Sequence, residues 1–419
     1  MNLLWLGGLI VCLTFFAIIK RYETRMVLLA SGVLMAAVSG KMSAAFDAFA
    51  KAMVNGGLVP VICSVMGFAF VMKYTKCDQH MVQLLAGSIT KLRLLLIPAA
   101  VMVTFAINIA LPSAAGCSAA VGAILIPALM KAGVHPAIAG SAVLAGTYGG
   151  TLSPGAAHSP FIAKLAGVDV MTVIAGHTVA AIVCGLIGGL VLMIVARVRK
   201  EHTGYVAAQE GASGQEKFTI NYIMALVPVV PLILLVLGSK QVNVLPYIAV
   251  HEAMLYGAVL GLIVCRSNPR TVTTQFFNGM GEAYANVIGI IVAAAVFTEG
   301  MSVIGLTGSL IEVMKHSEHI AKFAAAFGPM IIAVLCGSGD AATLAFNGAI
   351  TPHAAEFGYG ISQMGSAAFL SGSFGRTMSP VAGAAIVCAQ LAGVDPMELA
   401  KRNAPGMVIA AIVAMVILL

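Results

Sequence analysis

Two ionisable residues, Asp340 and Arg376, lie within apolar stretches of the sequence where charged side chains are rare. Asp340 belongs to the segment GSGDAATLAFNGAITP, and Arg376 belongs to SGSFGRTMSP. A charge in a membrane segment is costly, so such a residue is a candidate functional group by default. An arginine can hold a carboxylate through two parallel hydrogen bonds, and an aspartate can bind a cation or exchange a proton. The two residues predict a site for an organic anion and a coupling ion, with a structural Asp340–Arg376 ion pair as the alternative.

Small hydroxyl side chains accompany these charges at corresponding places in both halves of the chain. Hydroxyls, freed carbonyls and the N-termini of half-helices are the groups that an anionic substrate and a small cation need. A single serine in a membrane helix is more often a packing residue, but symmetric pairs at helix breaks favour a site. The candidates for substrate binding are Ser113, Ser118, Thr147, Thr151, Ser153, Ser338, Thr343, Ser373, Arg376, Thr377 and Ser379, and Asp340 is the candidate for the coupling ion.

Other polar residues fit structural roles better. His158 and His353 lie near helix breaks, where a proton role is an option, but a loop or packing histidine is the stronger interpretation. Asp169 and Asp395 each end a Leu-Ala-Gly-Val-Asp sequence before an apolar run, which predicts helix N-caps. The eight cysteines include no CxxC pair, which predicts packing residues and neither a disulfide framework nor a metal site.

The composition defines the class of protein that must position these groups. Only 9% of the 419 residues are charged, 60% are hydrophobic, and the mean hydropathy is +1.00. Soluble proteins carry about 25% charged residues, so a soluble fold is excluded. The continuous apolar runs predict an all-α polytopic membrane protein that contacts the lipid bilayer. The formal charge of +7 comes from basic residues in short loops, and no nucleic-acid motif accompanies it.

An internal repeat divides the chain into two halves. Residues 144–169, LAGTYGGTLSPGAAHSPFIAKLAGVD, align without gaps to residues 370–395, LSGSFGRTMSPVAGAAIVCAQLAGVD, and about half of the positions are identical. Residues 112–127, PSAAGCSAAVGAILIP, align in the same way to residues 337–352. Clusters of Gly, Ser and Pro at matching places in two halves predict broken helices around a transporter binding site. Simple kinked helices are the alternative, but a kink needs one Gly or Pro, whereas these motifs contain several each.

The basic residues orient the halves as two inverted repeats. With the N-terminus outside, most of the 23 Lys and Arg residues fall in cytoplasmic loops. Each half is expected to contain five transmembrane helices and one re-entrant hairpin, and this odd number of crossings inverts the second half relative to the first. The predicted regions are residues 1–196 for the first repeat with a hairpin at about 94–130, residues 197–217 for a cytoplasmic linker, and residues 218–419 for the second repeat with a hairpin at about 320–350. The expected arms of the first hairpin are 94–110 and 118–130, and a short amphipathic stretch up to residue 286 is expected before the span that ends at residue 304.

The sequence contains no motif of an enzyme or of an ATP-driven pump. It has no Gly-x-x-x-x-Gly-Lys phosphate loop, no HExxH zinc motif and no soluble catalytic domain. We therefore predict a secondary carrier that is not an enzyme and needs no cofactor beyond a coupling Na⁺ or H⁺. A channel is the alternative from another class, but duplicated broken helices imply an occluded central site and not a continuous wet path.

Four motifs resemble the anaerobic four-carbon dicarboxylate carriers of the DcuC family, within the ion transporter superfamily. They are NIALPSAAGCSAA at 108–120, GTYGGTLSPGAAHSP at 146–160, GSGDAATLAFNGAITPHA at 337–354 and SGSFGRTMSP at 371–380, and the likeness covers nearly the whole chain. The resemblance implies a homodimer with two opposed hairpins and elevator-type movement. In the dicarboxylate and citrate branch, Ser-Asn-Thr motifs at the hairpin tips bind carboxylates beside sodium. Here Ser113-Ala114-Ala115 and Ser338-Gly339-Asp340 replace them, which puts sodium coupling in question.

Together, the residues and the resemblance predict a multi-pass carrier of the bacterial inner membrane with both termini in the periplasm. Its expected substrates are C4-dicarboxylates (succinate, fumarate or malate), moved by exchange, uptake or efflux under anaerobic growth. The alternatives within transport are a carrier of another carboxylate and a cation/proton antiporter in which Asp340 binds the cation.

Overall fold

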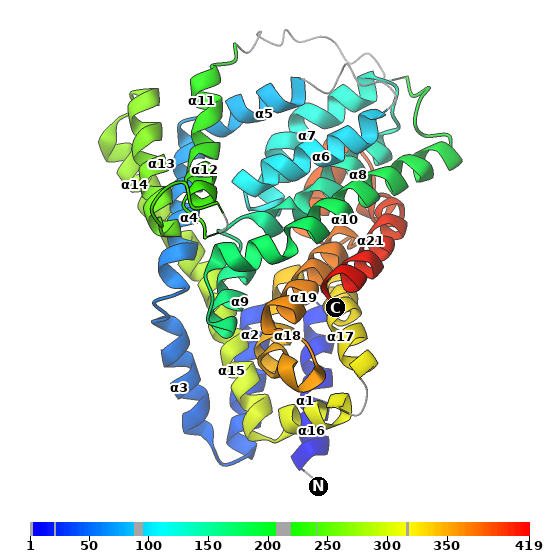
Figure 1. Ribbon diagram of the computed structural model, residues 1–419. Helices are drawn as coiled ribbons and strands as arrows, with labels where there is room; N and C mark the ends of the chain where they lie inside the picture. The colour runs from blue at the N-terminus through cyan, green and yellow to red at the C-terminus, as the bar shows by residue number, and fades with distance from the viewer. Residues whose placement is uncertain (1–2, 21, 88–94, 207–218, 241, 316–317) are drawn as a thin grey trace.

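The computed structural model describes residues 3–20, 22–87, 95–206, 219–240, 242–315 and 318–419, with side chains outside 313–319. Every regular element in these ranges is a helix, which confirms the predicted all-α class (Figure 1). The first half contains α1 (Leu3–Ile19), α2 (Thr24–Val38), α3 (Met42–Met53), α4 (Val59–Tyr74), α5 (Cys77–Gly87), α6 (Leu96–Ala110), α7 (Ala114–Lys131), α8 (Pro136–Gly146), the 3-10 helix η3 (Thr147–Leu152), α9 (His158–Ala166) and α10 (Val170–Val198).

The second half contains the remaining elements. They are α11 (Tyr222–Leu226), η4 (Val227–Val229), α12 (Val230–Leu237), α13 (Val250–Cys265), α14 (Pro269–Ala283), the π-helical turn η5 (Tyr284–Ile288), α15 (Gly289–Val303), α16 (Leu306–Lys315), α17 (Glu318–Cys336), α18 (Gly339–Ala349), η6 (Thr351–Phe357), α19 (Ile361–Thr377), α20 (Gly383–Ala392) and α21 (Pro396–Leu418). The predicted linker at 197–217 lies mostly outside the described residues.

Several helices are long and apolar enough to cross a membrane. Four unbroken stretches of the described residues meet this condition, namely α7, α10, the 35-residue stretch Pro269–Val303 and α21, and the bent pair of α4 and α5 adds a fifth. Other apolar helices have 10–17 residues. A chain with this many apolar helices is a multi-pass membrane protein. The amphipathic stretch expected before residue 286 is joined to the following span through η5, because the backbone continues from α14 into α15 without a break.

Long helices from the two halves cross one another in a first group. Helix α4 packs along α13 and α14, and α15 packs along α2 and α3 (Figure 1). Glycines permit the closest of these crossings, because a Cβ on Gly32 or Gly279 would overlap the backbone of α15 or α4 respectively. This group of helices forms one side of the molecule.

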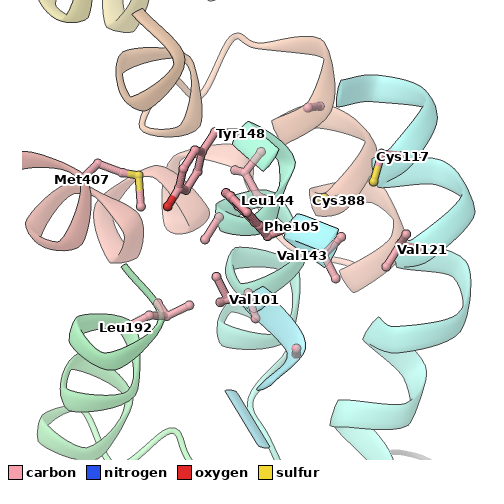
Figure 2. Packing of buried hydrophobic residues seen from close by; sticks show 14 of the residues in the cluster. Val101, Phe105, Cys117, Val121, Val143, Leu144, Tyr148, Leu192, Cys388 and Met407 are labelled. Carbon is pink, nitrogen blue, oxygen red and sulfur yellow. The ribbon is translucent and has the colours of Figure 1, made fainter. Parts of the chain in front are cut away.

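The remaining helices form a second packed group around the broken segments. Its largest apolar cluster draws on α6, α7, α8, α10, α19, α20 and α21. Figure 2 shows Val101, Phe105, Tyr148 and Met407 in this cluster. Tyr148 is 1% exposed, its ring lies 5.2 Å from the rings of Phe105 and Phe374, and its hydroxyl donates to the carbonyl of Ala181 at 3.1 Å. One aromatic side chain thus joins both halves of the chain.

Polar contacts hold each helix break against the neighbouring helix pair. In the first half, Asn108 of α6 accepts from the N–H of Gly150 at 2.5 Å and donates to the carbonyl of Leu111 at 2.8 Å. In the second half, the hydroxyl of Ser379 donates to the carbonyl of Val334 at 2.8 Å. Buried backbone groups need such partners, since an unpaired one costs about 1–3 kcal/mol.

The predicted N-caps are confirmed. The carboxylate of Asp169 accepts from the N–H of Met171 at 2.8 Å at the start of α10, and Asp395 accepts from Met397 at 2.7 Å at the start of α21. The repeated Leu-Ala-Gly-Val-Asp sequence therefore ends one helix at a left-handed glycine, Gly167 or Gly393, and begins the next.

Candidate functional site

A central cavity of about 330 Å³ lies where the helix breaks of both halves meet the long helix α4. Its walls come from the start of α7, from η3 and the segment leading to α9, from the tip of α18, and from the broken helix of α19 and α20. Ile62, Val65 and Met66 of α4 close the remaining side. Cavities of this size are typical of sites for small molecules.

The structure brings half of the predicted site residues to this cavity. Ser113, Thr147, Thr151, Ser373, Arg376 and Asp340 line it. The positions that the internal repeat aligns with the two charged residues, Ala115 and Gly150, line it as well. Asp340 and Arg376 therefore line the same cavity as the uncharged residues that align with them, and both belong to one site.

The other predicted residues make local hydrogen bonds outside the lining. Thr343 donates to the carbonyl of Ala368 at 3.4 Å, and Thr377 donates to that of Ser373 at 2.9 Å. Ser153 accepts from the N–H of Gly155 at 3.4 Å. Those outside the lining are Ser118, Ser153, Ser338, Thr343, Thr377 and Ser379, and the Ser118 hydroxyl is buried without a hydrogen-bond partner among the described residues.

The aligned serines Ser113 and Ser338 are helix N-caps. Ser113 accepts from the N–H of Gly116 at 3.2 Å, and Ser338 accepts from Ala341 at 3.3 Å. The helices α7 and α18 therefore begin immediately after these serines, which is four residues earlier in α7 than the expected hairpin arm from residue 118. Capping leaves both helix N-termini directed at the junction of the two halves, where their dipoles favour negative charge.

Arg376 reaches from the end of α19 across to the break of the first half. Its Nη1 donates to Thr147 Oγ1 at 3.3 Å, and its Nη2 donates to the Thr147 carbonyl at 3.0 Å. The structural pair considered for Arg376 and Asp340 is not formed, since no ion pair within 4.0 Å joins them among the described side chains. The remaining N–H groups of the guanidinium are available to the cavity that Arg376 lines.

Asp340 instead pairs with a histidine. Its Oδ1 lies 2.9 Å from Nε2 of His158, the first residue of α9. The imidazole is 2% exposed, whereas the carboxylate side chain is 66% exposed because it faces the cavity. His158 is thus a buried packing residue, with its ring 4.3 Å from that of Phe369, and it also contacts a charged residue of the cavity. The signal in the sequence was its place in the repeated break, but nothing there indicates a partner 182 residues away.

A second buried histidine, His177 of α10, was missed by the sequence analysis. Its Nδ1 lies 3.0 Å from Ser366 Oγ, and its Nε2 lies 3.0 Å from the carbonyl of Thr151. His177 has no aligned histidine and lies in the middle of an apolar helix, so no sequence pattern singles it out. Its contacts fix the wall of the cavity at Thr151.

Of two neighbouring cavities, one adjoins the central cavity and the other does not. An adjoining cavity of about 660 Å³, between α4, α5 and α7, shares the lining residues Met66, Pro112 and Ser113 with it. A third cavity of about 420 Å³, between α3, α9, α15 and α18, shares none of its described lining residues with the central cavity. The central cavity is therefore continuous in its lining with the cavity that Lys73 of α4 lines.

The donor set does not resemble a metal centre. No group of three or more His, Cys, Asp or Glu side chains with metal-binding geometry occurs among the residues that the structure describes. The cavity instead combines one guanidinium, one carboxylate, one imidazole, two threonine hydroxyls and two serine hydroxyls. Such groups bind carboxylates and exchange protons.

The comparison with protein families decides the identity. Residues 9–419 match the family described as the C4-dicarboxylate anaerobic carrier, DcuC. The chain belongs to the DcuC family. It is therefore a membrane transporter and not an enzyme.

Curated relatives agree with this assignment. A transporter of Haemophilus influenzae that is named only as uncharacterized is 42% identical over 269 residues, which cover 62% of this chain and 96% of the relative. The anaerobic C4-dicarboxylate transporter DcuC of Escherichia coli K12 is 24% identical over 379 residues, covering 86% of this chain and 80% of the relative. A Vibrio cholerae DcuC-type transporter is 24% identical over 434 residues, covering 93% and 91% respectively.

Proposed function

We propose that this member of the DcuC family carries C4-dicarboxylates such as succinate, fumarate and malate by binding them in the central cavity. The observation that carries the proposal is the position of Arg376, whose guanidinium lines the cavity with N–H groups to spare. A planar guanidinium fits a carboxylate through two hydrogen bonds. Ser113, Thr147, Thr151 and Ser373 add hydroxyls to the same wall.

The second carboxylate of the substrate is expected to lie near the helix N-terminus that Ser113 caps. Helix α7 begins at Ala114, which lines the cavity together with Ser113 and Ala115. The N–H groups and dipole of a helix N-terminus favour an anion. A short dicarboxylate would thus lie between Arg376 of the second half and α7 of the first, so that both halves select for its length.

We also propose the predicted arrangement of two inverted repeats, each with five transmembrane helices and one re-entrant hairpin. It is supported by the matching contacts of α4 with α13 and α14 and of α15 with α2 and α3. The helix pairs α6–α7 and α17–α18 are the proposed hairpins. The orientation follows the positive-inside rule, with both termini in the periplasm of a bacterial inner membrane.

The transport cycle is proposed to be of the elevator type in a homodimer. The group around α6, α7, α19 and α20 would move, and the group around α4 and α15 would stay fixed. One feature supports this division: the central cavity lies between the helix breaks on one side and α4 on the other. The adjoining cavity near Lys73 would then be the cytoplasmic entrance.

Asp340 is proposed to be the coupling residue for Na⁺ or H⁺ in uptake, exchange or efflux. It is an acidic side chain at a proposed hairpin tip and faces the substrate cavity. A carboxylate that faces a cavity within the membrane can bind a cation or a proton there. Replacing it by Asn should abolish gradient-driven accumulation more severely than exchange, because exchange does not require the ion to leave in each cycle.

Counterflow in liposomes tests the proposed function. Vesicles that contain purified carrier and an excess of unlabelled succinate should transiently accumulate labelled succinate from outside. The same panel should include fumarate, malate and a monocarboxylate of similar length, since a dicarboxylate site predicts no counterflow with the last. Absence of counterflow with every dicarboxylate would reject the proposal, and a saturable response to another carboxylate alone would support the sister-carrier alternative.

The cation/proton antiporter is the second candidate, and the Asp340–His158 pair is the observation that favours it. An antiporter of this kind would bind its cation at Asp340 without an organic anion. It would show cation-driven proton movement in vesicles that contain no dicarboxylate, and no counterflow of labelled succinate.

A further inference from the structure

The pair of His158 and Asp340 joins the two halves of the chain at the cavity. His158 begins α9, after the break of the first half, and Asp340 lies in the first turn of α18 in the second half. The distance of 2.9 Å between Nε2 and Oδ1 is that of a strong hydrogen bond. With the carboxylate accepting, Nε2 carries its hydrogen, and Nδ1 is the atom that remains to take up a proton.

The surroundings of His158 leave that second nitrogen unpaired. Nδ1 is buried and has no hydrogen-bond partner among the described residues. The ring of Phe369 lies 4.3 Å away and offers only its face. An orphaned buried polar atom is costly and calls for an explanation, and Nδ1 is the ring nitrogen that no described protein group occupies.

The other titratable groups around the cavity have different roles. Arg376 of α19 carries a permanent charge and is bound to Thr147. His177 of α10 has both nitrogens within 3.0 Å of partners, so it is already satisfied as a neutral ring. The hydroxyl of Tyr148 in η3 is directed to Ala181. Of these groups and the pair itself, the imidazole of His158 is the one with a ring nitrogen that has no partner among the described residues.

The chemistry of the pair suits a proton better than sodium. Hard cations are bound by several oxygen ligands, and an imidazole nitrogen is a ligand for softer metals. Here one carboxylate oxygen of Asp340 is already committed to His158. Sodium at this carboxylate would have to compete with the imidazole N–H, whereas a proton is accommodated by the pair as it stands.

Charge in the cavity links this proton to the substrate. When His158 is neutral, the charges of Arg376 and Asp340 cancel. A bound dianion then gives the cavity a net charge of two negative units. Loading transfers one proton from water to the imidazole and gives an imidazolium–carboxylate pair, and unloading returns that proton to water with no other bond changed. Negative charge nearby favours the protonated imidazole, so proton and dianion each strengthen the binding of the other.

We propose that His158 and Asp340 together hold the coupling proton, and that binding of a dicarboxylate dianion in the cavity promotes its uptake. This inference rests on the proposed function and identifies the coupling ion of that site. The pair spans α9 and α18, so any movement that separates the two elements leaves a buried imidazolium without its counter-charge. Because such a charge is expensive, opening at α18 would release the proton together with the substrate.

The test measures proton uptake on substrate binding to the purified carrier. Fumarate is the probe, since it stays a dianion between about pH 6 and about pH 9, the range in which histidine titrates. A pH-indicator dye in weakly buffered detergent solution reports protons, and titration calorimetry gives Kd at each pH. The variants are His158→Gln, which keeps an N–H donor, Asp340→Asn, and both together. His353→Gln is the matched control, because that exposed histidine pairs with Glu356 in η6, away from the cavity lining.

We expect about one proton to be taken up per fumarate bound, and Kd to rise about tenfold per pH unit above the titration of the pair. The control should behave in the same way. His158→Gln should bind fumarate with no proton uptake and a Kd independent of pH, and the double variant should lose no more pH-driven accumulation than either single variant.

Three results would overturn the inference. One is proton uptake by His158→Gln that equals the wild type, and another is fumarate binding that responds to Na⁺ and not to pH while counterflow persists. Absence of fumarate counterflow in the wild type rejects the proposed function, and the proton site falls with it. Counterflow retained by Asp340→Asn shows that a folded variant is available if His158→Gln does not fold.

Discussion

The replacement Arg376→Lys tests the central contact of the proposed site. Lysine keeps the positive charge but presents one nitrogen in place of the planar fork. In the structure the fork is already divided, since Nη1 and Nη2 both donate to Thr147, at 3.3 Å and 3.0 Å, while the side chain lines the cavity. The single nitrogen of a lysine cannot donate both hydrogen bonds to Thr147 and also form a bidentate contact with a carboxylate.

The magnitude follows from the contacts that are lost. A hydrogen bond to a charged group contributes about 1.5–3 kcal/mol, and the retained charge compensates part of it. We therefore expect a loss of about 1–3 kcal/mol, which raises the half-saturating substrate concentration roughly 5- to 150-fold. Thr147→Val removes only the longer bond to Oγ1 and keeps the carbonyl contact, so it should cost about 1 kcal/mol, or roughly fivefold.

The assay is the concentration dependence of succinate counterflow, with carrier quantity in the vesicles measured for each variant. Arg199→Lys is the matched control, because this arginine is 46% exposed, pairs with Glu201 after α10, and is remote from the cavity lining. It should leave the half-saturating concentration unchanged. If Arg376→Lys also left it unchanged, the assignment of Arg376 to a substrate carboxylate would be refuted.

Three further predictions concern other parts of the fold. Single cysteines at Ser113 and Ser338, in a background without reactive native thiols, should be protected from a polar thiol reagent by substrate, more strongly at Ser113 because it lines the cavity; no protection at either would separate the hairpins from the site. Gly155→Ala should slow transport, since its Cβ would overlap Val65 of α4, and Val65→Ala should restore part of the rate; an active single variant would contradict this contact. Glu201→Gln should lower stability in detergent by about 1–3 kcal/mol, because it removes one of the two carboxylates, Glu201 and Glu398, that pair with the 3% exposed Arg402 at 2.6 Å. Burial alone would raise the pKa of Glu201, but hydrogen bonds from Arg402 and Arg199 hold it below its usual value, so its contribution is present above the ordinary carboxyl range and lost as the pH falls through the lowered pKa. The unfolding temperature of the wild type should therefore fall at acid pH, and this part of the fall should be absent in Glu201→Gln. An identical pH profile in the variant would contradict the assigned role of Glu201.

Much of the local structure was predictable from short-range patterns. The repeated Leu-Ala-Gly-Val-Asp sequence correctly located two helix ends and two N-caps, because capping needs only residues within one turn. The Gly, Ser and Pro clusters located both breaks for the same reason. The start of α7 was placed four residues late because the cap at Ser113 is a single serine within a run of small residues.

The sequence by itself determined an all-α membrane protein with two related halves, and it singled out Asp340 and Arg376 as charges that lipid would not tolerate. Only the tertiary structure decided their partners. Arg376 contacts a threonine 229 residues away, and Asp340 contacts a histidine 182 residues away. Contacts of this kind depend on how α9, α18 and α19 pack against one another. This packing cannot be predicted from the local periodicity of the sequence. The aligned serines illustrate the same limit, since both cap helices but only Ser113 lines the cavity.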